Sequence, residues 1–272
     1  MINGNIKKRW FPLLYSIEKI KTALGCYRDA VKIIIEDLVP STNDMGKEIA
    51  LSERKENTLI LAYRQDKGKG RMGRNFFSPE GGIYMSLVIS ETGLSPEEIP
   101  LITPAAAVAV CRAIEELTPA KTKIKWVNDI FVDGGKACGI LTESVFSGDS
   151  FFSVVGIGIN LLPQAGGFPD ELRGIASSVY SENQAPAKNI MNQLVGTIVR
   201  ELLDQIKLVP SRDFSEEYRR RSFVIGKDVK VIQNGISRDA HVVSIDDDCR
   251  LGVKYQDGRE EFLFGGEISL KI

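Results

Sequence analysis

The chain reads Gln65-Asp-Lys-Gly-Lys-Gly-Arg-Met-Gly-Arg74 directly after an apolar, strand-like run, Thr58-Leu-Ile-Leu-Ala-Tyr63. Three glycines in this stretch allow backbone N–H groups to approach a ligand closely, and four Lys or Arg side chains supply positive charge. The next residues, Asn75–Gly82, contain turn formers, and Ile83–Ile89 predicts a second strand. A basic, glycine-rich loop between two strands predicts a site for an anionic ligand, a phosphate ester or a carboxylate.

Two familiar phosphate-binding motifs are excluded. Gly68–Gly73 satisfies the pattern G-x-G-x-x-G, but a dinucleotide fold needs a helix to begin at its end, because the helix N-terminus holds the pyrophosphate. No helix start follows here. A Walker A loop is excluded because no Gly-Lys-Ser/Thr ends the motif. Taken alone, the loop is equally compatible with a solvated basic hairpin, so the other motifs decide.

Composition indicates a soluble globular protein. The chain has 272 residues, of which 43% are apolar and 26% charged, enough for one large and one small domain. The formal net charge of −1 argues against a general polyanion-binding protein, so a nucleic-acid site would have to be local. No apolar run is long enough to span a bilayer, and the N-terminal apolar stretch is too short and broken for a signal peptide. We expect a cytoplasmic protein.

Cysteine and histidine usage narrows the chemistry. Cys26, Cys111, Cys138 and Cys249 lie far apart and form no C-x-x-C pair, so we expect reduced thiols in or near the core. The single histidine, His241, lies in a C-terminal strand pattern. We therefore expect neither a structural zinc site nor a Ser-His-Asp triad, and catalysis must depend on cations, carboxylates, amides and backbone groups.

The N-terminal half predicts a short extension and then a compact domain. Residues 1–30 are helix-prone, with Ile17, Ile20 and Leu24 at helical spacing, and are too few for a complete winged helix-turn-helix domain. Residues 31–38 predict the first strand, and Pro40–Asp44 predicts a turn and N-cap leading into a short helix. We expect Thr103 to cap a helix that has Pro104 at its first position and runs to Leu117.

The C-terminal half changes character near Ser222. Residues 123–162 alternate strand patterns with turns, and helices are predicted over about 189–208 and 213–221. After Phe223, short alternating strands with Asn234-Gly235 and Asp257-Gly258 turns predict a small barrel. We therefore expect domains at 31–222 and 223–272.

Five segments stand in a specific order. They are Ser41-Thr-Asn43; Gln65–Arg74 with Phe76-Phe-Ser-Pro79; Lys125-Trp-Val-Asn-Asp129 with Lys136-Ala-Cys-Gly-Ile-Leu141; Gly156-Ile-Gly-Ile-Asn160; and Gly265-Gly-Glu-Ile-Ser-Leu270. Together they resemble biotin–protein ligase, also called biotin–[acetyl-CoA-carboxylase] ligase, in a form without a complete N-terminal DNA-binding domain. The resemblance covers about residues 31–272.

The resemblance implies an α+β fold, with a mixed sheet and helices related to class II aminoacyl-tRNA synthetases, followed by an SH3-like barrel. It also implies a two-step reaction. Biotin and ATP, with Mg²⁺, give biotinyl-5′-AMP and pyrophosphate, and a lysine of the biotin carboxyl carrier protein of acetyl-CoA carboxylase then takes the biotin. The resemblance leaves the oligomeric state open, a homodimer included.

Residue roles follow from this resemblance. Biotin carries a neutral ureido ring, and Ser41, Thr42 and Gln65 offer neutral donors and acceptors, although Ser41-Thr42 alone could simply cap a helix. Gly156 and Gly158 would allow biotin close to the sheet, or else mark a β-bulge. The full set implied for biotin is Ser41, Thr42, Asn43, Gln65, Gly68, Lys69, Arg71, Trp126, Lys136, Gly139, Gly156 and Gly158.

Carboxylate attack on a phosphate brings two anions together, so fixed cations are needed. Lys136 and Arg71 are the expected catalytic residues, and Asp129 is the expected Mg²⁺ ligand, although Asn128-Asp129 could equally be only a turn. A lone lysine after a turn would otherwise be read as a surface residue. The set implied for ATP and the adenylate is Lys69, Arg71, Arg74, Phe76, Asn128, Lys136 and Asn160.

Departures from the family pattern are few. Lys69 stands where Arg is usual, Val127 where Pro is common, and Asp66 has no assigned role. Three other functions remain open: a lipoate–protein ligase of the same fold, a biotin-dependent transcriptional repressor, and a non-catalytic adapter. The loop pattern and C-terminal barrel favour biotin, the short N-terminal region argues against specific DNA binding, and the combination of Lys136, Arg71 and Asp129 argues against an adapter.

Overall fold

The computed structural model describes residues 14–52, 56–90, 92–147, 150–164, 166–233 and 235–270. Residues 1–13 of the expected N-terminal extension lie outside this set, as does Asn234 of one expected hairpin turn. In the described part of the chain, every helix is too short or too polar to traverse a lipid bilayer.

A seven-stranded mixed sheet forms the centre of the molecule. Its strand order is β1-β2-β3-β7-β6-β5-β4, with β1 and β2 parallel and every other neighbouring pair antiparallel. The expected mixed sheet with helices is thus confirmed. The strands are β1 (Val31–Val39), β2 (Asn57–Gln65), β3 (Ile83–Ser90), β4 (Thr122–Lys125), β5 (Asp129–Val132), β6 (Gly135–Ser147) and β7 (Ser150–Ile159).

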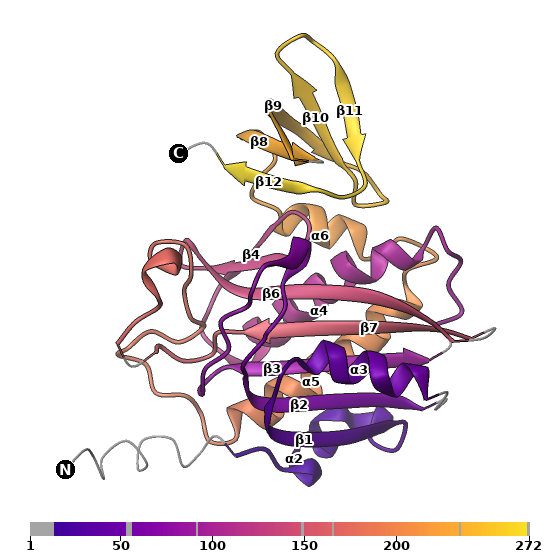
Figure 1. Ribbon diagram of the computed structural model, residues 1–272, viewed down its shortest axis with the longest axis vertical. Coiled ribbons are helices and arrows are strands. Elements are labelled where there is room, and N and C mark those ends of the chain that lie inside the picture. The colour runs from indigo at the N-terminus through magenta and orange to yellow at the C-terminus, as the bar shows by residue number, and fades with distance from the viewer. Residues whose placement is uncertain are drawn as a thin grey trace.

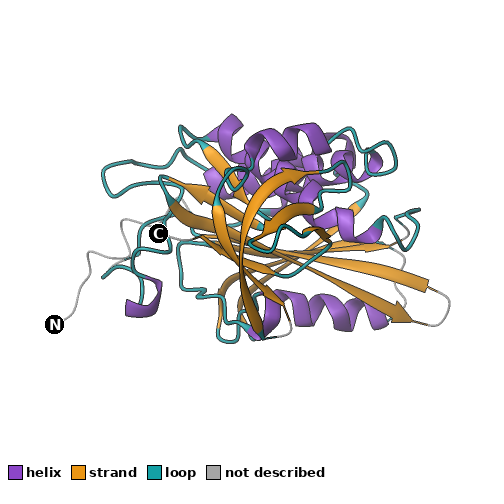
Figure 2. Ribbon diagram, turned by 90° about the horizontal axis from the view of Figure 1, so that it is seen from above, coloured by secondary structure: helices purple, strands orange, loops and turns teal. Residues whose placement is uncertain are grey.

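Helices cover both faces of this sheet (Figures 1 and 2). One face carries α3 (Thr42–Leu51), which contacts β2, β3, β6 and β7. The other face carries α4 (Ile102–Leu117) and α5 (Ile190–Lys207), and α2 (Ile17–Leu24) lies against α5. Gly46 allows α3 to lie close to the sheet, because a Cβ there would fall 2.8 Å from Val154. The first helix of the main domain is thereby fixed where its N-terminus can serve a site.

Local sequence explains where the two expected helices begin. Ser41 caps α3 as expected, its hydroxyl accepting from the Asp44 N–H at 3.4 Å. The expected start of α4 was wrong by two residues, since the helix begins at Ile102 and Pro104 is its third residue. A 3₁₀ turn, η4 (Ile99–Leu101), leads directly into α4 at Ile102, so the backbone is already helical and needs no side-chain cap. The hydroxyl of Thr103 instead bonds Thr142 of β6 at 2.9 Å.

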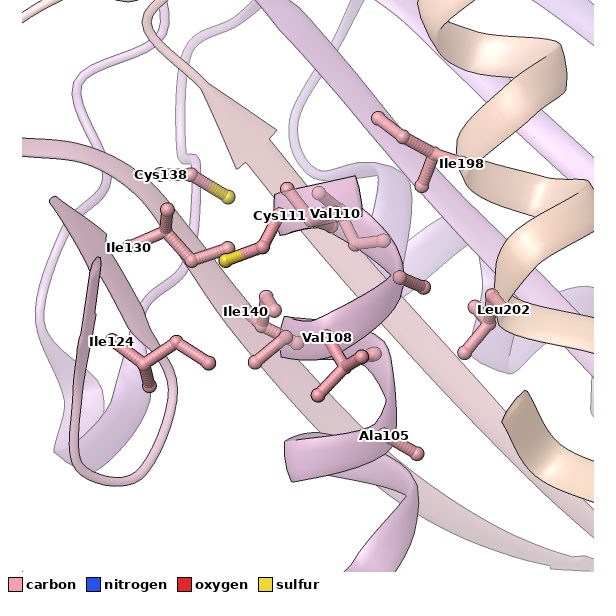
Figure 3. Packing of buried hydrophobic residues seen from close by; sticks show 14 of the residues in the cluster. Ala105, Val108, Val110, Cys111, Ile124, Ile130, Cys138, Ile140, Ile198 and Leu202 are labelled. Carbon is pink, nitrogen blue, oxygen red and sulfur yellow. The ribbon is translucent and has the colours of Figure 1, made fainter. Parts of the chain in front are cut away.

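The main core lies between the sheet and α4. Figure 3 shows Val108, Val110 and Cys111 of α4 beside strand residues and facing side chains of α5. Val108, Val110 and Cys111 are fully buried. Cys138 and Cys249 are also buried, whereas Cys26 is exposed and thus departs from the expected core placement. A nearly all-apolar α4 is therefore the element around which both the sheet and α5 pack.

The C-terminal part forms a second, five-stranded antiparallel sheet above the first (Figure 1). It follows α6 (Ser215–Arg221), and its strand order is β11-β10-β9-β8-β12. Trp126 ties it to the first sheet, donating from Nε1 to the Cys249 carbonyl at 2.9 Å. The strands are β8 (Asp228–Gln233), β9 (Ile236–Ile245), β10 (Leu251–Tyr255), β11 (Glu260–Leu263) and β12 (Glu267–Leu270).

The segment before β1 is built into the main domain. The helix expected around Ile20 and Leu24 is present as α2, and both side chains are fully buried. Asn192 of α5 pairs with the backbone on either side of Tyr15, accepting from Ser16 N at 2.7 Å and donating to Leu14 O at 3.0 Å. Residues 14–24 therefore complete the core rather than extend away from it.

Gly196 provides the test of this docking. A Cβ at Gly196 would fall 2.5 Å from Ala23 Cβ and 2.7 Å from Ile20 O, so α2 can approach α5 only because the residue is glycine. In an isolated helix, Gly→Ala would gain about 1 kcal/mol. We predict instead that Gly196→Ala lowers the free energy of unfolding by about 1–3 kcal/mol, because overpacking outweighs helix propensity. Urea denaturation measures this, and Ala23→Gly added to Gly196→Ala should recover part of the loss. A more stable single variant would contradict the packing described.

Candidate functional site

A cavity of about 280 Å³ lies between the glycine-rich loop, the N-terminus of α3, strands β5–β7 and the start of β12. It gathers residues from all five sequence segments described above. Gly68 and Asn160 are the two predicted site residues that the structure does not bring to its wall. The predicted residues that line the cavity are Ser41, Thr42, Asn43, Gln65, Lys69, Arg71, Arg74, Phe76, Trp126, Asn128, Asp129, Lys136, Gly139, Gly156 and Gly158.

One end of the cavity is neutral and rich in hydrogen-bonding groups. The Oε1 atom of Gln65 accepts from the backbone N–H of Thr42 at 2.8 Å, and the Gln65 Nε2 donates to Ser78 Oγ at 2.9 Å. Ser41 and Thr42 are only 2% and 3% exposed. Ser41 caps α3, and Ser41 and Thr42 both line the cavity, because the first turn of α3 borders it. The helix-cap interpretation and the cavity-wall interpretation are therefore compatible.

Glycines keep the sheet beneath the cavity bare. Gly158 pairs with Gly139 across β7 and β6, in a register that continues unbroken through Gly156. The β-bulge interpretation of these glycines is therefore wrong. A Cβ at Gly158 would fall 2.5 Å from the Phe76 ring, and one at Gly156 would fall 1.9 Å from Asn43 Oδ1. The missing side chains leave room for the Phe76 ring and the Asn43 amide to lie on the strands.

Lys136 and Asp129 form the centre of the charged end. The Lys136 Nζ lies 2.7 Å from Asp129 Oδ1, and both side chains are partly buried. Neighbouring backbone holds Lys136 on both sides, since its N–H donates to Ile175 O at 2.7 Å and its carbonyl accepts from Ser177 N at 2.9 Å. The backbone that carries Lys136 is thus held in place, and the ion pair with Asp129 keeps its ammonium at the cavity wall.

Arg71 reaches the same end from the glycine-rich loop. Its Nη1 donates to Asn128 Oδ1 at 3.0 Å, and Asn128 in turn donates to the Ile140 carbonyl at 2.8 Å. Burial lowers the pKa of Arg71 from its ordinary value, while the nearby Asp129 carboxylate opposes that shift. Asn128 therefore orients the guanidinium, and a bound anion would relieve its desolvation.

Two further loop cations, Lys69 and Arg74, are paired with carboxylates. Lys69 Nζ lies 2.6 Å from Asp44 Oδ1, at the first turn of α3. Arg74 Nη2 lies 2.5 Å from Glu267 Oε1, so the second sheet contributes to the cavity wall. In this arrangement both side chains hold the loop in place, and Arg71 is the loop cation directed at the charged end.

Lys125 is a cation of the site that was not predicted. It belongs to one of the five sequence segments, but no role was assigned to it. It lines the cavity, and burial lowers its pKa from the ordinary lysine value, with Asp129 opposing and Lys136 adding to the shift. The signal was its place in Lys125-Trp-Val-Asn-Asp129, next to a predicted metal ligand. Trp126 beside it is 4% exposed and lines the cavity, as expected of a wall residue.

Asn160 and Gly68 have supporting positions. The Asn160 Nδ2 lies 3.1 Å from Ser177 O and 3.4 Å from Lys136 O, so its amide braces the backbone around Lys136 and does not enter the cavity. A Cβ at Gly68 would fall 2.4 Å from Phe76 O, which makes Gly68 a close backbone crossing within the loop. The expected direct ligand contacts of these two residues therefore remain predictions without support from their placement.

Known proteins are similar to this chain in sequence and in fold. The model of the biotin/lipoate A/B protein ligase family matches residues 36–160. The biotin–[acetyl-CoA-carboxylase] ligase of Mycobacterium tuberculosis is 30% identical over 230 residues, 78% of this chain and 79% of that protein. The chain belongs to the biotin/lipoate A/B protein ligase family and, within it, to the biotin–protein ligases.

Two further likenesses place the chain. The bifunctional ligase/repressor BirA of Bacillus subtilis is 43% identical over 149 residues, which is 54% of this chain but only 46% of that relative's length. The biotin protein ligase from Aquifex aeolicus, solved in complex with biotin and ATP, superposes with a TM-score of 0.71 at 25% identity, covering 88% of this chain and 98% of that one.

Lys125 generates a prediction about stability. Because its folded-state pKa is lowered, the charged ammonium destabilises the folded state wherever it is protonated, and this cost fades as the pH rises toward the ordinary lysine pKa of 10.5. We predict that Lys125→Met raises the free energy of unfolding near pH 7, with the difference shrinking by about pH 10. Exposed Lys123 on the same strand supplies the control, since Lys123→Met should change little. Urea denaturation across this pH range measures both free energies of unfolding. Equal changes in Lys125→Met and Lys123→Met would contradict the desolvation of Lys125.

Proposed function

We propose that the chain activates biotin with ATP to biotinyl-5′-AMP and transfers biotin to a lysine of the biotin carboxyl carrier protein of acetyl-CoA carboxylase. One observation carries the proposal. A single cavity joins a neutral hydrogen-bonding end at Thr42 and Gln65 to a cationic end at Lys125 and Lys136. A ligand with a neutral polar ring and a terminal carboxylate, next to a nucleotide phosphate, matches both ends.

The first step depends on cations that face two anions. The biotin carboxylate attacks the α-phosphate of ATP, and pyrophosphate leaves with the electron pair of the broken P–O bond. Lys136 would bridge the carboxylate and the α-phosphate, and Arg71 would neutralise charge on the phosphate. Preorganised donors at such a site are each worth about 3 kcal/mol or more of transition-state stabilisation. The fixed backbone of Lys136 is the structural basis for that preorganisation.

Asp129 would hold Mg²⁺. In the described part of the chain no three His, Cys, Asp or Glu side chains gather as a metal site, so an all-protein cage is not the arrangement proposed. Magnesium commonly takes one or two carboxylates together with phosphate oxygens and waters, which a single Asp beside a nucleotide site satisfies. The ion would offset the negative charge of the phosphates, and Lys136 would then exchange its Asp129 contact for substrate.

The second step needs an open path to the adenylate. The carrier lysine, as a free amine, attacks the carbonyl carbon of the mixed anhydride, and AMP leaves with the bonding electrons. The glycine-rich loop would shield the adenylate until the carrier docks.

We assign residues 31–222 to the catalytic domain and residues 223–272 to an SH3-like barrel, whose Glu267 anchors Arg74 of the loop. We expect a cytoplasmic protein, and a homodimer stays one of the open oligomeric states.

Lipoate transfer is the competing function within the family. Mass spectrometry of a carrier domain incubated with the chain, MgATP and either biotin or lipoate separates the two. The proposal predicts a mass gain with biotin alone. A gain with lipoate and none with biotin would reverse the assignment, and no gain with either would favour an adapter. A sequence-specific, salt-resistant gel shift strengthened by biotin and ATP would instead support a repressor.

Lys136→Ala should abolish adenylate formation while leaving the fold intact, because its amine acts on the transition state. We expect pyrophosphate release to fall by at least about 10²-fold, the usual cost of removing one such donor. Thermal unfolding within a few degrees of the unaltered protein would establish that the variant is folded. Pyrophosphate release at the original rate would remove Lys136 from the mechanism.

Arg71→Gly should weaken retention of the intermediate more than its formation, because the loop loses its bond to Asn128 and its charge-assisted contact with the phosphate. Released biotinyl-AMP would then acylate bystander lysines. We predict that Arg71→Gly biotinylates an added unrelated protein more than the unaltered chain does, and that Lys136→Ala does not biotinylate it. If Arg71→Gly turns over ATP without extra bystander labelling, the loop does not act as a lid.

A further inference from the structure

A second layer of polar residues lies behind the neutral end of the cavity. Ser86 on β3 and Glu143 on β6 do not line the cavity, yet both contact Asn43, which does. Ser86 is fully buried, and Asn43 is 4% exposed. Polar groups buried this deeply must satisfy one another, so the direction of each hydrogen bond among them can be worked out from which atoms can donate.

The orientation of the Asn43 amide is determined by its neighbours. Its Nδ2 lies 2.8 Å from Glu143 Oε2 and 3.2 Å from the Leu141 carbonyl. Both neighbours can only accept, so the amide nitrogen must face them and Oδ1 must face the other way, toward Ser86. Lys47, 2.9 Å from Glu143 Oε1, is the counter-charge of this carboxylate.

The Ser86 hydroxyl then has no choice of direction. Its oxygen lies 2.6 Å from Asn43 Oδ1 and 2.8 Å from Thr42 Oγ1. Asn43 Oδ1 can only accept, so the single Ser86 proton goes there, and Ser86 accepts from the Thr42 hydroxyl. The other partner within reach of that hydroxyl is Gln65 Oε1 at 3.2 Å, which is also an acceptor. In either arrangement the Thr42 proton is used within the protein, and Thr42 presents a lone pair to the cavity.

Gln65 presents the opposite polarity. Its Oε1 accepts from Thr42 N, which can only donate, so the amide orientation is again determined. The Ser78 hydroxyl donates to the Phe76 carbonyl at 2.9 Å and therefore accepts one N–H of Gln65 Nε2. Among the described residues, no partner is found for the second N–H of Gln65. The cavity thus offers an acceptor at Thr42 next to a donor at Gln65.

We propose that Glu143, Asn43 and Ser86 are positioning residues that fix Thr42 as a hydrogen-bond acceptor and thereby select ligands carrying an H–N–C=O edge. A cyclic urea donates its N–H to Thr42 and accepts at its carbonyl from Gln65. A dithiolane ring has neither group, and a ring with oxygen in place of that N–H would face Thr42 lone pair to lone pair. This inference rests on the proposed function and adds the reason for its ligand selectivity.

Calorimetric binding without ATP tests the inference apart from catalysis. The probes are biotin and the two cyclic carbamate analogues in which one ureido N–H is replaced by oxygen. The disfavoured isomer is the one whose ring oxygen takes the place of the N–H that faces Thr42. The unaltered chain should bind this isomer at least about tenfold more weakly than biotin, a loss on the order of one mismatched hydrogen bond. The quantity compared between variants is the ratio of these two dissociation constants. Ser86→Ala leaves the Thr42 proton only the longer contact to Gln65 Oε1, at 3.2 Å, and that oxygen already accepts from the Thr42 N–H. The proton is then held less firmly, so this ratio should fall at least roughly threefold. Ser153→Ala is the matched control, since Ser153 is a fully buried serine of the same sheet with no partner among the described residues.

A second pair of variants covers the case in which Ser86→Ala does not fold. Glu143→Gln places an amide beside Asn43 that can turn its own N–H₂ toward it. The Leu141 carbonyl, at 3.2 Å, is then the remaining acceptor that holds the Asn43 nitrogen in place. Asn43 can therefore reverse, and with it the chain of bonds as far as Thr42, at the cost of that longer bond. The binding ratio should fall again. Lys47→Met removes the charge partner of Glu143 but leaves its bond to Asn43, so the ratio should stay at its original value.

Each outcome decides. A lowered ratio in a folded Ser86→Ala, with both controls unchanged, supports the positioning role, and Glu143→Gln takes its place if Ser86→Ala does not fold. An unchanged ratio in that deciding variant, while the unaltered chain binds biotin, overturns this inference and leaves the proposed function standing. Failure of the original chain to bind biotin, with lipoate bound instead, overturns both.

Discussion

The absence of side chains on a short stretch of two paired strands is the constraint on which the site depends. Gly139 and Gly158 face each other across β6 and β7, and Gly156 follows two residues along the same face. Only on this bare surface can the Phe76 ring and the Asn43 amide lie against the sheet. Any Cβ there would push the glycine-rich loop or α3 away, and the cavity between them would lose its shape.

Electrostatics impose the second constraint. The cavity gathers Lys125, Lys136 and Arg71 around the carboxylate of Asp129, and burial lowers the pKa of both Lys125 and Arg71. Such a cluster destabilises the empty fold and is relieved when anions enter. The cost is therefore a stability–function trade-off, since the same desolvation that strains the protein strengthens its hold on phosphate and carboxylate. Paired cations at the rim, such as Lys69 with Asp44, hold the loop without adding to this strain.

Most helices and strands, and most residues of the cavity wall, could be predicted from the sequence, because local sequence signals coincide there with functional residues. The cap at Ser41, the glycines of the loop and the hairpin turns each have a local physical cause. Long-range contacts were out of reach. Nothing near Thr103 in sequence reveals that Thr142 takes its hydroxyl. Asn160 matched a motif, yet its amide braces the backbone at Ser177.

The second layer of polar residues behind the cavity was not predicted from the sequence, for a related reason. Ser86 and Glu143 stand in apolar or mixed strand patterns that carry no motif, and their importance arises only from the register that places β3 and β6 beside α3. Lys125 was visible in its motif, but its lowered pKa follows from burial beside Lys136, which spacing alone does not give. Residues that act through other residues are thus the ones a single sequence conceals.

The central claim is that one cavity forms a biotinyl adenylate. Native mass spectrometry of the chain mixed with MgATP and biotin, with no carrier present, tests it most directly. We expect one biotinyl-AMP held per chain and pyrophosphate in solution. A chain that retains only unreacted biotin or ATP, or that forms an adenylate with lipoate in place of biotin, would contradict it.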